Sequence, residues 1–228
     1  MIRLITFDLD GTLAELGAPT LPEHVEQLRL LEQRGFTIAV CSGKPTYYLC
    51  GFLRQLGLQR PVLAGENGAV IQLGIDLPPK EFYIQPYSDA AKESIVWLRN
   101  ELERQLPGLF YQPNLVGLTP FPTSKQQFDR IQQLLDRNAD RLRDVEIYRH
   151  ADSFDITPCG LNKFSGMELL GRILSISPAE TACVGDGVND YPMFAYAGLS
   201  IGIHLAQPEK ADMNFKSIGE ALNYLLTI

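Results

Sequence analysis

The sequence lacks any apolar segment approaching the roughly 20 residues that a membrane-spanning helix needs. It is also short of positive charge, with 20 lysines and arginines against 27 aspartates and glutamates and a formal net charge of −7. Because an acidic surface does not attract nucleic acids or anionic membranes, we expect neither as a partner. The chain starts directly on a strand-like pattern with no leader-like segment, which predicts a cytoplasmic protein.

Cysteine and histidine are scarce, and neither is arranged as a metal site. The four cysteines have none of the short paired spacings that build zinc sites, and without a signal peptide we expect free, buried thiols. The three histidines are scattered, so we predict no catalytic role for them. These residues are Cys41, Cys50, Cys159 and Cys183, and His24, His150 and His204.

The remaining composition is typical of a folded globular protein, with 45% hydrophobic and 21% charged residues. This balance excludes wholesale disorder and coiled-coil classes. A chain of 228 residues can bury a sizeable core, either as one domain or as a domain that carries an insert.

Strand-like and helix-like patterns alternate at both ends of the chain. Such alternation predicts an α/β fold, a Rossmann-like three-layer core with a mainly parallel sheet. Functional residues are then expected at the carboxyl ends of the strands. The expected strands are 2–7, 36–41, 61–64, 181–184 and 199–203, and the expected helices are 22–34, 45–56, 163–174 and 217–226.

The middle of the chain has a different pattern and predicts an inserted α+β domain over residues 79–156, with a core of residues 1–78 and 157–228. Proline-containing segments at 77–80 and 157–161 are suited to linkers. One continuous domain with proline turns is the alternative. Within the insert we expect extended segments at 81–85, 115–119, 145–148 and 153–156, and helices at 89–105 and 125–138.

Two carboxylates follow the first expected strand. Asp8 and Asp10 are two residues apart, so in an extended chain their side chains point to the same side. Such a pair repels unless a cation lies between the carboxylates, and hard oxygen ligands favour Mg²⁺. Gly11 permits a sharp turn, and Thr12 offers a hydroxyl to a phosphate. The alternative is an ordinary acidic turn.

Three further runs lie near the expected strand ends and helix starts. Ser42-Gly43-Lys44 follows the second strand, Lys163 begins a helix, and a glycine-rich acidic run spans 185–190. Taken singly, each run has an ordinary structural explanation: Ser42 as a turn or helix-cap serine, Lys163 as a solvated surface lysine, and 185–190 as an Asx- and Gly-rich surface turn. A separate segment, 66–69, contains Asn67-Gly68 and is best interpreted as a hairpin turn.

Together, and in this order along the chain, the acidic pair and the three further runs resemble the four motifs of haloacid dehalogenase superfamily phosphohydrolases. The first motif is Phe7-Asp8-Leu9-Asp10-Gly11-Thr12, and the resemblance covers both core segments. The insert matches the position of the type C2 cap in the Cof-like, class IIB branch, near archaeal-type phosphoglycolate phosphatases and sugar-phosphate phosphatases. The resemblance implies a magnesium-dependent phosphatase.

The resemblance implies catalytic roles for three residues. Asp8 is expected to attack phosphorus and form an aspartyl-phosphate, and Asp10 to protonate the leaving oxygen and then activate water. Lys163 is expected to neutralise charge around the phosphate.

The resemblance also implies ligands for the metal and the phosphate. Asp186 is expected to bind Mg²⁺ directly, Asp190 directly or through water, Asp8 through its carboxylate and Asp10 through its backbone carbonyl. The phosphoryl group is expected to contact Leu9, Thr12, Ser42, Gly43, Lys163 and Asn189, and Asn189 is an alternative partner for orienting Lys163. Relatives often carry arginine at the position of Lys44, so its contact with phosphate is left open.

A cap of this kind is expected to close over the leaving group and to select a small phosphorylated metabolite. Lys125, Arg149 and His150 are candidates, although a solvated face explains each of them better. The alternatives are a phosphomutase with the same intermediate, a receiver-type phosphoacceptor and a non-catalytic phosphometabolite sensor. We expect a monomer or a homodimer.

Overall fold

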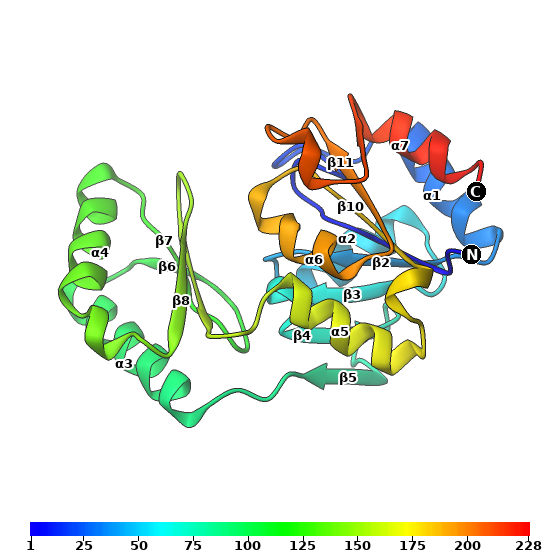
Figure 1. The fold of residues 1–228 in the computed structure, drawn as a ribbon. Helices are drawn as coiled ribbons and strands as arrows, with labels where there is room; N and C mark the ends of the chain where they lie inside the picture. Colours follow the sequence, from blue (N-terminus) through cyan, green and yellow to red (C-terminus); the bar gives the residue numbers. More distant parts are fainter. The chain divides into compact units, whose positions relative to one another are not determined.

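An eight-stranded sheet organises the core in the computed structural model, which describes residues 1–228 (Figure 1). The strand order is β12-β11-β10-β1-β2-β3-β4-β5, and every pair from β12 to β3 is parallel. The predicted α/β class with a mainly parallel sheet is therefore confirmed. The strands are β1 (Leu4–Phe7), β2 (Thr37–Cys41), β3 (Val62–Gly65), β4 (Val70–Leu73), β5 (Glu81–Ile84), β10 (Thr181–Gly185), β11 (Leu199–Ile203) and β12 (Met213–Phe215).

Helices cover both faces of this sheet because successive strand side chains point to opposite sides. On β2, Ile38 and Val40 pack under one group of helices, whereas Ala39 and Cys41 pack under the other. The first group is α1 (Pro22–Gln33), α2 (Thr46–Leu56) and α7 (Ile218–Leu225), with α1 and α7 side by side in Figure 1. The second group is α5 (Lys163–Leu174) and α6 (Tyr191–Tyr196).

The turn at Asn67 reverses the chain between β3 and β4. These two strands pair antiparallel, and the short 3-10 helix Glu66–Gly68 joins them. Glu66, Asn67 and Gly68 all have positive φ, which Asn and Gly tolerate best. The predicted hairpin turn is confirmed.

Residues 84–161 form a separate compact unit, and residues 1–83 with 162–228 form the core unit. Both boundaries of the insert lie a few residues after the predicted boundaries, 79 and 156. The segment expected to be extended over 81–85 forms β5, which lies in the central sheet and not among the strands of the insert.

Two antiparallel hairpins and two helices build the insert. The hairpins are β6 (Phe110–Gln112) with β7 (Thr119–Phe121), and β8 (Val145–Arg149) with β9 (Phe154–Pro158). Reciprocal backbone hydrogen bonds between Leu118 and Ile156, 2.9 and 3.0 Å, join them. The helices are α3 (Asp89–Gln105) and α4 (Lys125–Arg137), which begin where Ser88 and Ser124 accept hydrogen bonds from Ala91 N–H and Gln127 N–H.

Two sequence expectations are wrong. The strand expected at 115–119 is mostly a loop, with Leu115 52% exposed, and the actual pair is β6 with β7. The apolar pattern suggested a strand because Val116 is buried, but Val116 lies in a loop. Cys159 is exposed and not buried, because it follows β9 in a turn, although all four cysteines are free. None of the helices is long and apolar enough to cross a membrane.

Candidate active site

The carboxyl ends of β10, β1 and β2 meet at one edge of the sheet because these strands are parallel neighbours. Asp8 follows β1, Ser42 follows β2 and Asp186 follows β10. The Asp8 N–H donates to the Val184 carbonyl at 2.8 Å, which continues the pairing of β1 with β10. Sheet topology therefore brings together three motifs that are far apart in sequence.

Lys163 reaches this edge from the first turn of α5. Its helix begins there because the Asn162 side chain accepts hydrogen bonds from the Phe164 and Ser165 N–H groups. Lys163 Nζ donates to Asp8 Oδ1 and to Asp190 Oδ1, both at 2.6 Å. All three side chains are buried, with Lys163 only 1% exposed.

Asp190 holds both the lysine and the loop that carries Asp186. Its second oxygen, Oδ2, accepts hydrogen bonds from the N–H groups of Asp186 and Gly187, at 2.9 and 3.0 Å. A buried carboxylate with this many charge-assisted bonds is held rigidly. Asp190, and not Asn189, therefore orients Lys163, while the Asn189 side chain is exposed.

The loop after β1 approaches Asp186 very closely. Thr12 Oγ1 donates to Asp186 Oδ1 at 2.9 Å, so its hydroxyl supports this carboxylate. Gly11 has φ +89°, and a Cβ there would lie 2.4 Å from Asp186 Oδ2. Glycine is thus required both by the backbone conformation and by the approach of the carboxylate.

The carboxylates of Asp8, Asp186 and Asp190 form a cluster in which one oxygen of each lies within 4.8 Å of the others. Only Lys163 balances these three charges from within the cluster. An all-oxygen set with excess negative charge suits a hard divalent cation. The Asp10 carboxylate is not in this cluster and forms an ion pair with Lys44, with Nζ–Oδ2 3.3 Å.

Burial and crowding of acids change the protonation of this cluster. Burial is the main cause that raises the pKa of Asp8 from 3.8 to about 7; Asp190 and Asp186 raise it further, and Lys163 opposes them. Burial also raises the pKa of Asp186. For Lys163, burial lowers the pKa, but the neighbouring Asp190 and Asp8 outweigh it and the pKa is raised. The lysine therefore stays charged.

A sequence model of haloacid dehalogenase-like hydrolases matches residues 5–112 and 114–214, which is most of the chain. The chain belongs to this family. The predicted family and enzyme class, a haloacid dehalogenase-type phosphatase, are confirmed.

Two curated relatives of this haloacid dehalogenase-like hydrolase are phosphatases. A phosphoglycolate phosphatase from Methanopyrus kandleri is 24% identical over 223 residues, covering 97% of this chain and 90% of the relative. An HMP-PP phosphatase from Serratia proteamaculans is 26% identical over 237 residues, covering 92% and 86%. The chain thus spans nearly the full length of both relatives.

Solved structures share the fold. A haloacid dehalogenase-like hydrolase from Bacteroides thetaiotaomicron superposes with a TM-score of 0.79 at 18% identity, covering 100% of this chain and 99% of the other. A sugar phosphatase of the haloacid dehalogenase subclass IIB gives a TM-score of 0.72 at 19% identity, covering 99% and 100%.

The other motif residues of the hydrolase support its loops. The Leu9 side chain is buried, and its carbonyl accepts from the N–H groups of Thr12 and Ala14. Ser42 is buried, and its Oγ accepts from the Lys44 N–H at 3.2 Å. The ion pair of Lys44 with Asp10 was not foreseen, because it depends on how two loops meet.

Sequence reasoning also missed a contact between two glycines. A Cβ on Gly166, one turn after Lys163 in α5, would lie 2.6 Å from the Gly68 Cα. Gly68 belongs to the β3–β4 turn, whose Asn67 N–H donates to the Ser42 carbonyl at 2.9 Å. A glycine inside a helical pattern costs about 1 kcal/mol relative to alanine, so its presence at 166 was a usable signal of close packing.

Gly166→Ala is expected to lower kcat about 10- to 100-fold, because the added methyl pushes α5 away from the turn and displaces Lys163 from Asp8. Steady-state kinetics measure this change. The matched control is Gly51→Ala in α2, where a Cβ meets nothing within 4 Å and activity should be unchanged. Equal kinetics for both variants would contradict the positioning role.

Asp8→Asn is expected to stabilise the metal-free protein at pH 8 but not at pH 4. The raised pKa means that folded Asp8 holds its proton more tightly than unfolded Asp8, so this contribution to stability is present below pH 3.8 and is lost as the pH rises through about 7. Because the asparagine side chain does not ionise, the variant does not lose this stability as the pH rises.

Thermal unfolding in EDTA measures this stability effect. The expected increase in Tm is at least about 5 °C at pH 8, with nearly equal values at pH 4. A Tm difference between variant and wild type that does not depend on pH would show that ionisation of the buried Asp8 carboxylate does not destabilise the folded protein.

Proposed function

We propose that this phosphatase is a magnesium-dependent phosphomonoester hydrolase that acts on small phosphorylated metabolites, sugar phosphates or phosphoglycolate, through an aspartyl-phosphate at Asp8. The observation that carries the proposal is the buried Asp8 carboxylate, held by Lys163 at 2.6 Å beside the carboxylates of Asp186 and Asp190. The names of the curated relatives support the substrate class.

Asp8 has the features of a nucleophile. Lys163 binds Oδ1, which fixes the carboxylate and leaves Oδ2 as the attacking oxygen. Attack forms an O–P bond to Asp8 and breaks the bond to the leaving alcohol. Burial excludes bulk water from the carboxylate, so the resting nucleophile is weakly solvated.

Asp10 is proposed as the acid and base of the reaction. Its side chain is 28% exposed, so the carboxyl group is accessible to a leaving oxygen or a water molecule. The Lys44 ammonium, 3.3 Å away, fixes the direction of the carboxylate. Asp10 would donate a proton to the alcohol and then accept one from the water that hydrolyses the intermediate.

The carboxylates of Asp8 and Asp186 and the backbone carbonyl of Asp10 would hold Mg²⁺, with Asp190 supporting them through Lys163 and the Asp186 loop. When bound, the ion would offset charge on the phosphoryl oxygens. Lys163, Ser42 and the N–H groups near Leu9, Asp10 and Gly43 would stabilise the same oxygens. Asn189 remains a candidate phosphate contact, and Thr12 is assigned to supporting Asp186.

Residues 84–161 are proposed to be the C2-type cap domain of this hydrolase. In this assignment, the cap selects the leaving group and the core carries out phosphoryl transfer.

A metabolite panel tests the proposal. Purified protein is incubated with phosphoglycolate and with a series of sugar phosphates, with Mg²⁺ or with EDTA, and inorganic phosphate is measured. We expect release only with the metal and no need for a sugar bisphosphate. A requirement for such an activator would favour the phosphomutase, and the absence of turnover on every compound would favour the sensor.

A further inference from the structure

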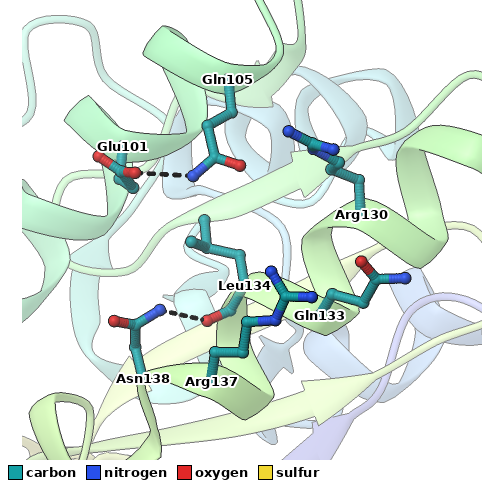
Figure 2. A pocket seen from close by; sticks show the side chains of 7 residues that line it. All are labelled: Glu101, Gln105, Arg130, Gln133, Leu134, Arg137 and Asn138. Carbon is teal, nitrogen blue, oxygen red and sulfur yellow. Dashed lines mark hydrogen bonds between the residues drawn. The ribbon is translucent and has the colours of Figure 1, made fainter.

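A cavity lies within the insert, between the C-terminal half of α3 and α4 (Figure 2). Its volume is about 300 Å³, at the small end of the range for ligand pockets. None of its residues belongs to the site around Asp8. The lining residues are Glu101, Gln105, Arg130, Gln133, Leu134, Arg137 and Asn138.

Two arginines give this cavity its chemistry. Arg130 and Arg137 are seven residues apart, about two helical turns, and therefore lie on one face of α4. Figure 2 shows both guanidinium groups beside the same cavity. Arg137 also lies in the last turn of α4, where the helix dipole favours a cation, but Arg130 does not share that explanation.

The acidic residues next to these arginines in α4, and the one acidic residue of the cavity lining, all bind other partners. Asp129 forms an ion pair with Lys125 at 2.6 Å, and Asp136 accepts from Gln132 at 2.8 Å. Glu101 is bound by Arg104 and by Gln105. In a chain of net charge −7, two arginines without carboxylate partners therefore stand at one cavity.

Most other arginines of the insert are partnered, which sets this pair apart. Arg99 pairs with Glu103 and Arg104 with Glu101, while Arg141 lies over the Trp97 ring at 4.5 Å and Arg149 over the Phe128 ring at 4.7 Å. An uncompensated pair of guanidinium groups is suited to carboxylate or phosphate oxygens.

The rest of the lining restricts the ligand further. Glu101 and Gln105 lie on the α3 side and are joined by a 2.7 Å hydrogen bond, so the carboxylate is fixed in place (Figure 2). Its oxygens accept hydrogen bonds and repel a second anionic group. Leu134 contributes an apolar surface, and Gln133 and Asn138 add amide groups. The ligand must combine an anionic end with hydroxyl donors.

We propose that this cavity binds a small hydroxylated oxyanion, a carboxylate or a phosphate ester, with its anionic group on Arg130 and Arg137 and its hydroxyl groups toward Glu101. The site is separate from the catalytic centre and does not depend on the proposed phosphatase mechanism. Because it is built entirely from the insert, its occupancy can be followed without reading the catalytic centre.

Trp97 offers that measurement because it is the only tryptophan of the chain and lies on α3, one turn before Glu101. The full-length protein is titrated in EDTA with tartrate, which has two carboxylates and two hydroxyls, and with succinate, which lacks the hydroxyls. Glycerol 3-phosphate replaces tartrate in a parallel titration to distinguish a phosphate from a carboxylate ligand. Sodium chloride at equal ionic strength controls for screening.

We expect a saturable change in Trp97 fluorescence with tartrate or glycerol 3-phosphate and weaker binding of succinate. Arg130→Gln combined with Arg137→Gln should raise Kd at least about tenfold, since two charge-assisted hydrogen bonds are lost. The matched control is Arg143→Gln, an exposed arginine of the insert that does not line the cavity.

A non-saturable change, a change that sodium chloride reproduces, or equal Kd values for the double variant and the wild type would overturn the proposal. Circular dichroism checks that the double variant is folded, which is expected because both arginines are exposed.

Discussion

Replacing Asp8 with asparagine is expected to lower kcat by at least about 10⁴-fold, while the protein stays folded and still binds Mg²⁺. The amide nitrogen and carbonyl of asparagine cannot act as the attacking oxygen, so no covalent intermediate forms. Lys163 keeps its bond to Asp190, which preserves the site. Phosphate release under saturating substrate measures the effect.

The matched control is Glu168→Gln, an exposed carboxylate on α5 that should leave kcat unchanged. Acid-quenched wild-type enzyme mixed with ³²P-labelled substrate should carry label on the Asp8 peptide, and hydroxylamine should remove it. Normal turnover by a folded, metal-loaded Asp8→Asn protein would reject the covalent mechanism.

Replacing Lys163 with methionine is expected to damage both activity and stability. The lysine is the only cation bonded to the buried carboxylates of Asp8 and Asp190, so its loss leaves buried charge uncompensated. Breaking such a buried pair costs about 3–5 kcal/mol. In the proposed mechanism Lys163 also stabilises the transferring phosphoryl group, so its loss should lower kcat by at least about 10²-fold.

The pH dependence of the loss of stability in Lys163→Met identifies the cause of that loss. Because removal of Lys163 raises the pKa of Asp8 further, the stability difference from the wild type should be smaller at pH 4, where Asp8 is protonated in both proteins, and should grow as the pH rises above about 7. Urea unfolding at several pH values, in EDTA, measures this difference. Lys216→Met, at an exposed position, should change neither property. A loss of stability that is equal at pH 4 and pH 8 would show that the charge of Asp8 is not its cause.

Local sequence patterns determined much of the core. The alternation of strands and helices predicted the parallel sheet, and the helix expected at 163–174 is α5 with the same limits, because Asn162 caps it. The placement of Asp8 directly after β1 followed from the period of the strand and from the position of the acidic pair. Each of these features depends only on residues close together in the chain.

Tertiary structure decided the contacts that join the motifs. Thr12 and Asp186 are 174 residues apart, and their hydrogen bond exists because β1 and β10 are neighbours in the sheet. The pairing of Lys44 with Asp10 and the approach of Gly68 to Gly166 have the same origin.

By itself, then, the sequence determined most of the core strands and helices, the motif residues and the family, because hydrophobic period, caps and turns are local properties of the chain. It did not determine the place of β5 at the edge of the central sheet, the β6–β7 pair or the arginine cavity of the insert. Those depend on strand order and on the packing of helix faces, which a one-dimensional pattern does not encode.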